Sequence, residues 1–425
     1  MLRILRKCNL SSSFRALRSR NFRLFLIGQG ISLTGTWMTR LATSWLVYRL
    51  TDSAFLLGLV SFAGQIPVFF IPAFAGVWLD RWDRHRVLIV LQTLAGLQSL
   101  SLAALTLTHH ITIIWLILLT FVQGVINAVE IPTRQSFVIK MVDDRADLTN
   151  AIALNSSNFN IARLVGPAIA GLVVAAIGEG YCFLIDGVSY AAVIAGLLMM
   201  RIKKDQPVHT DRHVMHDLLE GWRYLTSHAP IRSILMFMAM IGIAGAPYYV
   251  LTPIIAGRVL HGGANTLGFL MAAAGIGALV CAIALVLRRS PRGLARLTAI
   301  AIGVFSFARV GLGLSHWFWV SMALMSIAGY GLMTQIVASN TIIQTLVDDD
   351  KRGRVMSFYT IALQGSMPVG SLLGGSLAAR MGAPATLIAS GFVCALMALW
   401  FWSKLPEMRP VMRTRYAELG ILPEG

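Results

Sequence analysis

The stretch GVWLDRWDRHRVL, residues 76–88, places six polar or charged side chains in seven positions between two long apolar runs. Gly76 lies one helical turn before Asp80, and Arg84 lies one turn after it. A solvated loop would account for the charges but would not require this spacing. The apolar runs on either side, and their counterparts along the chain, decide which fold contains the stretch.

The composition is that of a protein that crosses a membrane several times. Of the 425 residues, 56% are hydrophobic and only 13% are charged, whereas soluble domains carry roughly 25% charged residues. The length would accommodate several soluble domains, but no segment has the composition of one. The four cysteines are widely separated and form no CxxC pair, so neither a disulfide framework nor a metal site is predicted.

Twelve apolar runs reach the length of about 20 residues that a transmembrane helix requires. Because they are too long for barrel strands and lack a period of two, they predict α-helices. The first run exceeds the roughly 7–15 apolar residues of a signal peptide, so we interpret it as an uncleaved first span. The runs are centred in 22–49, 55–79, 87–108, 111–133, 149–177, 181–200, 231–257, 265–287, 294–314, 317–345, 355–379 and 384–403.

Lysine and arginine residues gather in alternate loops. One set of loops, together with both termini, contains nearly all of them, whereas the opposite loops contain only Arg49, Arg258 and Arg380. The positive-inside rule therefore predicts that both termini and the stretch 76–88 are cytoplasmic, in a protein of the bacterial cytoplasmic (inner) membrane. The net charge of +17 follows from this topology and does not require a nucleic-acid partner.

The longest internal connection, 201–229, divides the chain into two halves with similar motifs. The segments MVDDRADLTNAIAL (141–154) and LVDDDKRGRVMSFY (346–359) follow the fourth and tenth runs, and GPAIAG (166–171) is matched by GSLLGG (370–375). Paired six-helix halves are typical of duplicated transporters. We predict an all-α membrane protein with twelve transmembrane helices in two pseudo-symmetric six-helix bundles, divided into a cytoplasmic segment 1–21, a bundle 22–200, a cytoplasmic linker 201–229, a bundle 230–404 and a cytoplasmic tail 405–425.

The linker contains apolar residues at helical spacing: Val214, Leu218, Trp222 and Leu225. This spacing predicts a short helix. The helix either lies on the inner leaflet as an amphipathic element or packs beneath the bundle, and both placements fit the pattern.

With these motifs assembled, the chain resembles the major facilitator superfamily from about Phe14 to Leu405. Within it, the likeness is to the drug and siderophore exporters that include enterobactin exporters and macrolide efflux pumps. The most specific feature lies between the second and third runs, where the superfamily has Gly, three residues, Asp and Arg, two residues, and Arg with a further basic residue. This sequence has Asp83 where the superfamily usually has Gly, and it matches at Gly76, Asp80, Arg81, Arg84 and Arg86.

The spacing of this motif also has a physical interpretation. Gly76 lets a neighbouring helix approach closely. Asp80 is a carboxylate at the membrane edge, which is costly unless it meets a cation or a helix N-terminus. The start of the eleventh run, with Arg352 and Arg354, offers both. We therefore predict a cytoplasmic latch between the halves, formed by the motif and Arg354; the alternative is a tight hydrophilic turn that only sets the topology.

A second motif, NSSNFNIARLVGPAIAG, lies in the fifth run. Gly166, Pro167 and Gly171 match the Gly–Pro-rich signature of exporters in the superfamily, with Ala170 in place of one expected Gly. Proline frees a backbone carbonyl and glycine allows close contact, so the motif predicts a helix bend where the halves meet.

The fourth run departs from a related pattern. At the position where proton-coupled drug antiporters of the superfamily carry an Arg, this sequence has Thr120. The departure puts the usual proton relay of those antiporters in doubt.

Polar residues within the runs need a partner or a purpose, because an ionisable group at membrane depth costs about 2.5–3.5 kcal/mol. Arg163 shares a helical face with Ser156 and Asn160, and Arg40 belongs to a polar stripe. Each arginine is interpreted as a cavity residue or, alternatively, as an anchor between helices. In the superfamily that the chain resembles, helices one, four, seven and ten line the cavity. The resemblance therefore implies that polar and aromatic residues of these helices bind substrate together with Arg163: Gln29, Trp37, Arg40, Gln123, Asn127, Tyr248, Tyr249 and Gln335.

Two acids lie within the runs. Glu130 has Arg134 one turn away, which favours a local ion pair. Asp186 lies about two turns from the outer surface, where we expect it to be hydrated. Both are available as coupling residues if protons drive transport. Arg309, near an outer helix end, is expected to extend its side chain toward the surface.

These features predict a secondary active transporter that exports amphipathic drug- or siderophore-like molecules by alternating access. No GxxxxGK[ST] loop is present, so an ion gradient, by elimination a proton gradient, is the expected energy source. The sequence contains neither an HExxH nor a GxSxG motif, so we do not predict an enzyme. The expected partners are the lipid bilayer, a small-molecule substrate and protons. We expect a monomer and predict no cofactor, metal or nucleic acid. The alternatives are a lipid or lysophospholipid flippase of the same fold and a non-transporting sensor or scaffold.

Overall fold

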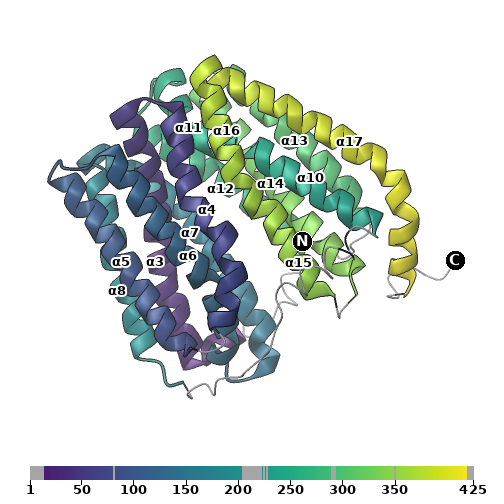
Figure 1. Cartoon of the computed structure of the whole chain (residues 1–425), viewed down its shortest axis with the longest axis horizontal. Coiled ribbons are helices and arrows are strands. Elements are labelled where there is room, and N and C mark those ends of the chain that lie inside the picture. Colours follow the sequence, from purple (N-terminus) through teal and green to yellow (C-terminus); the bar gives the residue numbers. More distant parts are fainter. Residues whose placement is uncertain are drawn as a thin grey trace, which may run out of the picture.

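The computed structural model describes residues 14–79, 82–202, 223, 225, 228–288, 293–348 and 351–418. Throughout these residues the regular secondary structure is helical (Figure 1). Two groups of predicted residues lie outside this range: Asp80 and Arg81 of the latch, and Val214, Leu218 and Trp222 of the linker helix.

The described N-terminal half contains six long helices, which follow the apolar runs closely. Their bounds are α3 (Arg20–Thr51), α4 (Ala54–Leu79), α5 (Arg84–Leu107), α6 (Ile113–Met141), α7 (Leu148–Ile177) and α8 (Glu179–Leu198), with short segments η1 (Arg15–Arg18) and η2 (Arg145–Asp147) before α3 and α7. The turn after α3 is tight because Asp52 adopts a left-handed φ of 46° and its amide donates to the Tyr48 carbonyl over 2.7 Å. Gly178, at φ 96°, makes the turn between α7 and α8.

The described C-terminal half contains α10 (Ala229–Gly245), α11 (Pro247–Ile254), η3 (Ile255–Val259), α12 (Ala264–Val286), α13 (Leu294–Leu314), α14 (Phe318–Leu346), α15 (Arg352–Thr360), η4 (Ile361–Gly365), α16 (Ser366–Met381) and α17 (Ala383–Glu418). Pro247 starts α11 directly after α10, because a proline interrupts regular helical hydrogen bonding. The π-helical segment η4 joins α15 to α16 just before Pro368, whose missing amide has the same effect. Both interruptions divide a predicted run into shorter helices.

Ten helical stretches among the described residues are long and apolar enough to cross a membrane. They coincide with ten of the twelve predicted runs. The other two runs are also helical, as α3 and as α15–η4–α16, but α3 carries the polar stripe that contains Arg40 and the other run is divided by η4. The last helix, α17, continues past residue 404 through Pro406 and Pro410 to Glu418.

Each half packs around its own helices, and two helix pairs join the halves. In the N-terminal half α8 packs against α3 and α5, and in the C-terminal half α17 packs against α13 and α10. Between the halves, α4 lies along α16 and α7 lies along α12 (Figure 1). The largest hydrophobic cluster spans both halves and includes Leu225 of the linker, while a smaller cluster around Phe22 and Phe137 belongs to the N-terminal half.

The two halves lie close together at one end and diverge at the other (Figure 1). We call the end at which α3 finishes and α4 begins the outer end. The end that contains η1 and the last turns of α17 is called the inner end. These names follow the predicted distribution of positive charge, and the close approach of the halves at the outer end is where the candidate gate lies.

Candidate transport pathway and gates

Two close crossings of helix backbones join the halves near the outer end. In the first, α4 meets α16 at Gly58 and Gly375. A Cβ atom added to Gly58 would lie 2.6 Å from the Ser371 carbonyl oxygen, and one added to Gly375 would lie 2.9 Å from Gly58 Cα. No larger residue therefore fits at either position without moving a helix. Beside this crossing the Ser61 hydroxyl donates to the Ser371 hydroxyl over 3.3 Å.

In the second crossing α7 meets α12 at Gly171 and Gly268. A Cβ atom added to Gly171 would lie 2.8 Å from the Ala264 carbonyl oxygen and 2.9 Å from Gly268 Cα. A Cβ atom added to Gly268 would lie 2.7 Å from the Pro167 carbonyl oxygen. The helix pair thus approaches as closely as the first pair, again because both contact residues lack a side chain.

The two crossings occupy equivalent places in the two halves. Gly58 and Gly268 are each the fifth residue of the second long helix of their half, since α4 begins at Ala54 and α12 at Ala264. Gly171 and Gly375 end the matched segments GPAIAG and GSLLGG. Gly171 belongs to a motif found in the sequence, whereas Gly58 and Gly268 were missed. Their signal is the small-xxx-small pattern that opens each helix, AFLLG and ANTLG, which favours close helix packing.

Gly166, the first residue of the predicted Gly–Pro motif, faces α3 of the N-terminal half. A Cβ atom added to Gly166 would lie 2.6 Å from Trp37 Cβ and 2.9 Å from the Thr34 carbonyl oxygen of α3. Through Pro167, α7 continues as a single helix from Leu148 to Ile177. The motif therefore places α7 between two partners, with α3 on one side and α12 on the other.

Ion pairs surround the outer end. Arg258 of η3 donates to the Asp52 carboxylate at the end of α3, so this pair bridges the two halves. Because both side chains are more than half exposed, the pair is worth only about 0–1 kcal/mol. Arg49 Nε lies 2.8 Å from Glu179 Oε1 at the edge of a cavity of about 740 Å³, which is also lined by Trp45, His109, Tyr181, Gly263 and Ala264.

Two predicted arginines border the interface between the halves, further in from the crossings. The Arg40 guanidinium lies 4.7 Å from the centre of the Trp37 ring, and Arg40 is exposed. Arg163 is half-buried and precedes Leu164, whose Cα would lie 3.1 Å from a Cβ atom added to Gly275 of α12 in the other half. Across the interface α3 also approaches α11, the helix that carries Tyr248 and Tyr249.

The other predicted substrate-binding residues differ in their access to solvent. Tyr249 is 39% exposed, and on the half-buried face of α6 the Gln123 amide donates to Asn127 Oδ1 over 3.1 Å. Three residues are instead buried within their own half, where they do not reach solvent in this conformation: Gln29, Tyr248 and Gln335. The Gln335 amide, for example, donates to the Met238 sulfur over 3.0 Å.

The two predicted coupling acids have different surroundings. The ion pair expected for Glu130 is confirmed, because Arg134 Nε lies 2.8 Å from Glu130 Oε1. The expectation that Asp186 is hydrated is wrong. Asp186 is 1% exposed, and its Oδ2 accepts hydrogen bonds from Thr39 Oγ1 (2.8 Å) and Ser99 Oγ (2.6 Å). Distance from the helix end did not predict burial because α3 and α5 both cover this position of α8.

The expectation that Arg309 extends toward the surface is also wrong. Arg309 is fully buried, and its guanidinium donates to Cys394 Sγ over 3.2 Å and to Ser390 Oγ. It also lies 5.1 Å from the centre of the Phe305 ring. The side chain points between α13 and α17, because a serine and a cysteine on α17 provide acceptors there.

A family described as transmembrane secretion effectors, within the major facilitator superfamily, matches residues 11–417. The chain belongs to this family. Similar proteins include the staphyloferrin A transporter of Staphylococcus aureus, 25% identical over 92% of this chain and 96% of that protein. The multidrug efflux pump Tap of Mycolicibacterium fortuitum is 25% identical over 86% and 91% of the two chains. The enterobactin exporter EntS of Shigella boydii is 24% identical over 92% and 94%.

Solved structures show the same fold. The transporter resembles the POT family transporter PepTSo with a TM-score of 0.72 and 12% identity, over 94% of this chain and 99% of that one. It resembles a mutant of the nucleoside transporter NupG with a TM-score of 0.70 and 13% identity, over 91% and 99%. The protein is therefore a membrane transporter of the major facilitator superfamily and not an enzyme.

The latch motif of this transporter is partly described. Gly76 lies in the last turn of α4, and Arg84 begins α5. The Asp83 side chain caps α5 by accepting from the His85 amide over 2.9 Å, and its Oδ2 lies 3.8 Å from Arg86 Nε. Asp83 therefore acts as a helix cap where the superfamily usually has glycine. Arg354, the expected partner of the latch, lies in the first turn of α15.

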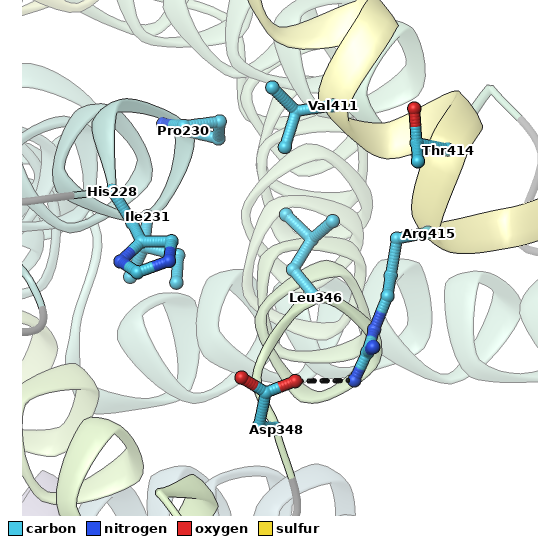
Figure 2. Close-up of a pocket in the computed structure, with 8 residues that line it drawn as sticks. All are labelled: His228, Pro230, Ile231, Leu346, Asp348, Val411, Thr414 and Arg415. Carbon is cyan, nitrogen blue, oxygen red and sulfur yellow. Dashed lines mark hydrogen bonds and ion pairs between the residues drawn. The ribbon is translucent and has the colours of Figure 1, made fainter. Parts of the chain in front are cut away.

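A small cavity of about 350 Å³ lies at the inner end of the transporter's C-terminal half. Figure 2 shows that it is formed where the last turns of α17 pass the start of α10 and the end of α14. Arg415 Nη2 lies 2.8 Å from Asp348 Oδ1 and ties α17 to the loop before α15. The extension of α17 is thus attached to the end of α14. The cavity is lined by His228, Pro230, Ile231, Leu346, Asp348, Val411, Thr414 and Arg415.

Proposed function

We propose that this transporter exports amphipathic small organic molecules, of the drug or siderophore kind, across the bacterial cytoplasmic membrane by alternating access. The carrying observation is the pair of equivalent glycine crossings, Gly58–Gly375 and Gly171–Gly268, that hold the halves together near the outer end. A transporter whose halves meet at one end and diverge at the other is open toward the diverging end. The structure then represents an inward-open state.

The proposed topology has twelve transmembrane helices with both termini in the cytoplasm. It is supported by the ten helical stretches that meet the length and composition for a span and by the positive charge at the inner end. The direction of transport is supported by the relatives, since the enterobactin exporter and the efflux pump Tap are named for export.

The proposed inner gate is the motif Gly76, Asp80, Arg81, Arg84 and Arg86, which would clasp the start of α15 at Arg354 when the outer crossings separate. In this cycle the outer and inner contacts alternate, so that the substrate site never opens to both sides. Arg415 and Asp348 form an ion pair between α17 and the end of α14, close in sequence to the start of α15 on which the clasp would close.

Protons are the proposed coupling ion, and Asp186 is the stronger of the two candidate carriers. Glu130 is neutralised by Arg134 at 2.8 Å, whereas Asp186 is buried and meets only hydroxyl donors at its Oδ2. A carboxylate that is buried without a cation is destabilised in its charged form. Protonation therefore changes the energy of this region more than it changes that of the Glu130–Arg134 pair.

The test is transport by the purified full chain in liposomes with an imposed pH gradient. Export predicts substrate movement against its gradient, from the side equivalent to the cytoplasm, that stops when a protonophore collapses the pH difference. Labelled lysophospholipid in the same vesicles tests the flippase alternative. If lysophospholipid moves and no soluble dye or drug does, export of small molecules is wrong and flipping replaces it.

A further inference from the structure

The proposed export function leaves the chemical class of the cargo open, and the arginines at the interface narrow it. We infer that the substrate site selects organic anions, molecules with a carboxylate beside an apolar or aromatic portion, and that Arg40 and Arg163 bind the negative charge. This inference rests on the proposed function because it assigns a ligand to the same interface.

Within the part of the chain that the structure describes, neither arginine has an acidic partner. Other arginines there do pair with a carboxylate, for example Arg49 with Glu179, Arg134 with Glu130 and Arg258 with Asp52. Arg40 instead lies over the Trp37 ring, and Arg163 makes no hydrogen bond or ion pair to a described residue. An unpaired guanidinium at membrane depth is costly, and an anionic ligand would supply the missing charge.

Arg40 and Arg163 lie on either side of one contact between helices. Trp37 of α3 touches Gly166 of α7, and these two helices run in the same direction. Arg40 lies three residues beyond Trp37, and Arg163 lies three residues before Gly166. At a rise of about 1.5 Å per residue, the two positions are separated by roughly 9 Å along the helix axes. A molecule with two acidic groups could therefore contact both arginines at once.

Aromatic rings lie next to Arg40 and on α11, the helix that approaches α3 from the other half. The Trp37 ring packs edge-on against Phe159, with 5.8 Å between ring centres, and Tyr249 packs edge-on against Tyr248 at 4.9 Å. A guanidinium that stacks on a ring keeps its N–H groups free at its edge, where they can bind a carboxylate in the plane. The site thus combines an anion-binding group with apolar surface, as an amphipathic organic anion requires.

The surrounding charges do not reverse this preference. Glu130 is neutralised by Arg134, and the Asp186 carboxylate accepts from Thr39 and Ser99 within the N-terminal half. Arg309 of α13 is also positive, but it is fully buried and donates to Ser390 and Cys394 of α17. Arg309 cannot meet a ligand in this state, so it adds to the positive potential without taking part in binding.

Two xanthene dyes test the inference because they share a ring system and differ in charge: carboxyfluorescein is an anion and rhodamine 123 is a cation. Binding to the full chain in nanodiscs is measured by fluorescence polarisation. The parent protein should bind carboxyfluorescein at least about tenfold more tightly than rhodamine 123, since a charge-assisted hydrogen bond is worth about 1.5–3 kcal/mol. Arg40→Gln and Arg163→Gln should each weaken carboxyfluorescein binding about tenfold and leave rhodamine 123 binding unchanged or tighter.

A matched control is Arg296→Gln. Arg296 is exposed at the inner end of α13 and lies over the Trp402 ring at 5.4 Å, so the substitution removes the same charge and the same kind of contact far from the interface. It should not change binding of either dye. Arg40→Lys and Arg163→Lys keep the charge and should retain part of the anion affinity, which separates charge recognition from loss of folding.

Equal affinity of the parent for the two dyes, tighter binding of rhodamine 123, or an Arg40→Gln/Arg163→Gln double variant that binds carboxyfluorescein like the parent would overturn the inference. Transport separates this result from the proposed function. If the chain exports rhodamine 123 but neither binds nor moves carboxyfluorescein, export stands and anion selectivity is wrong. If it moves neither dye in a pH gradient but binds the anion through the arginines, anion selectivity stands and export is wrong.

Discussion

At one equivalent helix contact, both halves bury a charged group, but the two charges have opposite signs. Asp186 of α8 and Ser390 of α17 follow the positive-φ glycines Gly178 and Gly382 at the same spacing. In the N-terminal half the acid is on this helix and Ser99 of α5 donates to it over 2.6 Å. In the C-terminal half the serine is on this helix, and the neighbouring helix α13 provides the donor, Arg309.

Both halves therefore have the same contact, a serine on one helix that meets an ionisable side chain on its neighbour. The ionisable side chain is an aspartate in the N-terminal half and an arginine in the C-terminal half. Asp186 can bind and release a proton, whereas the Arg309 guanidinium keeps its charge. Among the described residues, Asp186 Oδ1 and Arg309 Nε each find no hydrogen-bond partner. We therefore expect the N-terminal site to respond to the proton gradient and the C-terminal site to act as a fixed positive charge.

The largest effect is expected from removing the titratable group of the N-terminal site. Asp186→Asn keeps the shape and the acceptor oxygen but cannot carry a proton, so pH-driven transport should fall by about 100-fold, as expected for loss of a proton-transfer group. Substrate binding should be retained. Transport and dye binding in proteoliposomes measure the two quantities separately.

Glu130→Gln is the comparison variant, because Glu130 is already paired with Arg134 and should contribute less to coupling. If Asp186→Asn pumps as fast as the parent, the assignment of a coupling role to the N-terminal site is wrong. If Glu130→Gln loses coupling instead, the role belongs to α6.

A second effect concerns the contacts that are alike in both halves. Gly58→Val and Gly268→Val each add a side chain at a crossing where even a methyl group clashes with backbone atoms. Each should destabilise the outer-closed state by about 1–3 kcal/mol and favour opening at the outer end. Cross-linking between cysteines introduced at Asp52 and Arg258 should fall in both variants by similar amounts.

Gly303→Val is the control for this experiment, since a Cβ atom at Gly303 would meet nothing within 4 Å. Unequal effects of the Gly58 and Gly268 variants would show that one crossing alone holds the outer end closed. Unchanged cross-linking in both would mean that neither does.

A smaller effect is expected at the C-terminal buried charge. Arg309→Met replaces a buried cation with an apolar side chain of similar length, and it leaves Ser390 with its hydrogen bond to the Leu387 carbonyl at 3.1 Å. The substitution should be neutral or stabilising by about 1–2 kcal/mol, as measured by the thermal melting of the detergent-solubilised protein. Proton-driven transport should remain. A loss as large as that of Asp186→Asn would make Arg309 part of the coupling mechanism.

The smallest effect is expected at the exposed bridge between the halves. Arg258→Gln removes the pair with Asp52, and because both side chains are largely exposed the cost should be below about 1 kcal/mol. The residual effect should shrink further at high salt, which screens exposed charges. Cross-linking across the outer end at low and high ionic strength measures this, and a strong, salt-independent effect would place the bridge among the principal gate contacts.

Sequence reasoning succeeded where a property depends on neighbours along the chain. The helices follow the apolar runs because length and hydrophobicity are local properties, and the Glu130–Arg134 pair was predicted because residues four apart share a helical face. Sequence reasoning failed for Asp186 and Arg309, whose exposure to solvent was predicted from their distance to a helix end. Depth along a helix does not specify which neighbouring helix covers a side chain.

The amino-acid sequence by itself determined the helical class, the division into two similar halves and the family, because apolar run length, charge asymmetry and short motifs are written along the chain. Only the tertiary structure decided that Gly58 meets Gly375, that Gly171 meets Gly268, and that the halves bury charges of opposite sign at equivalent places. Those contacts join helices that are distant in sequence, and whether two such helices touch depends on how the whole bundle packs.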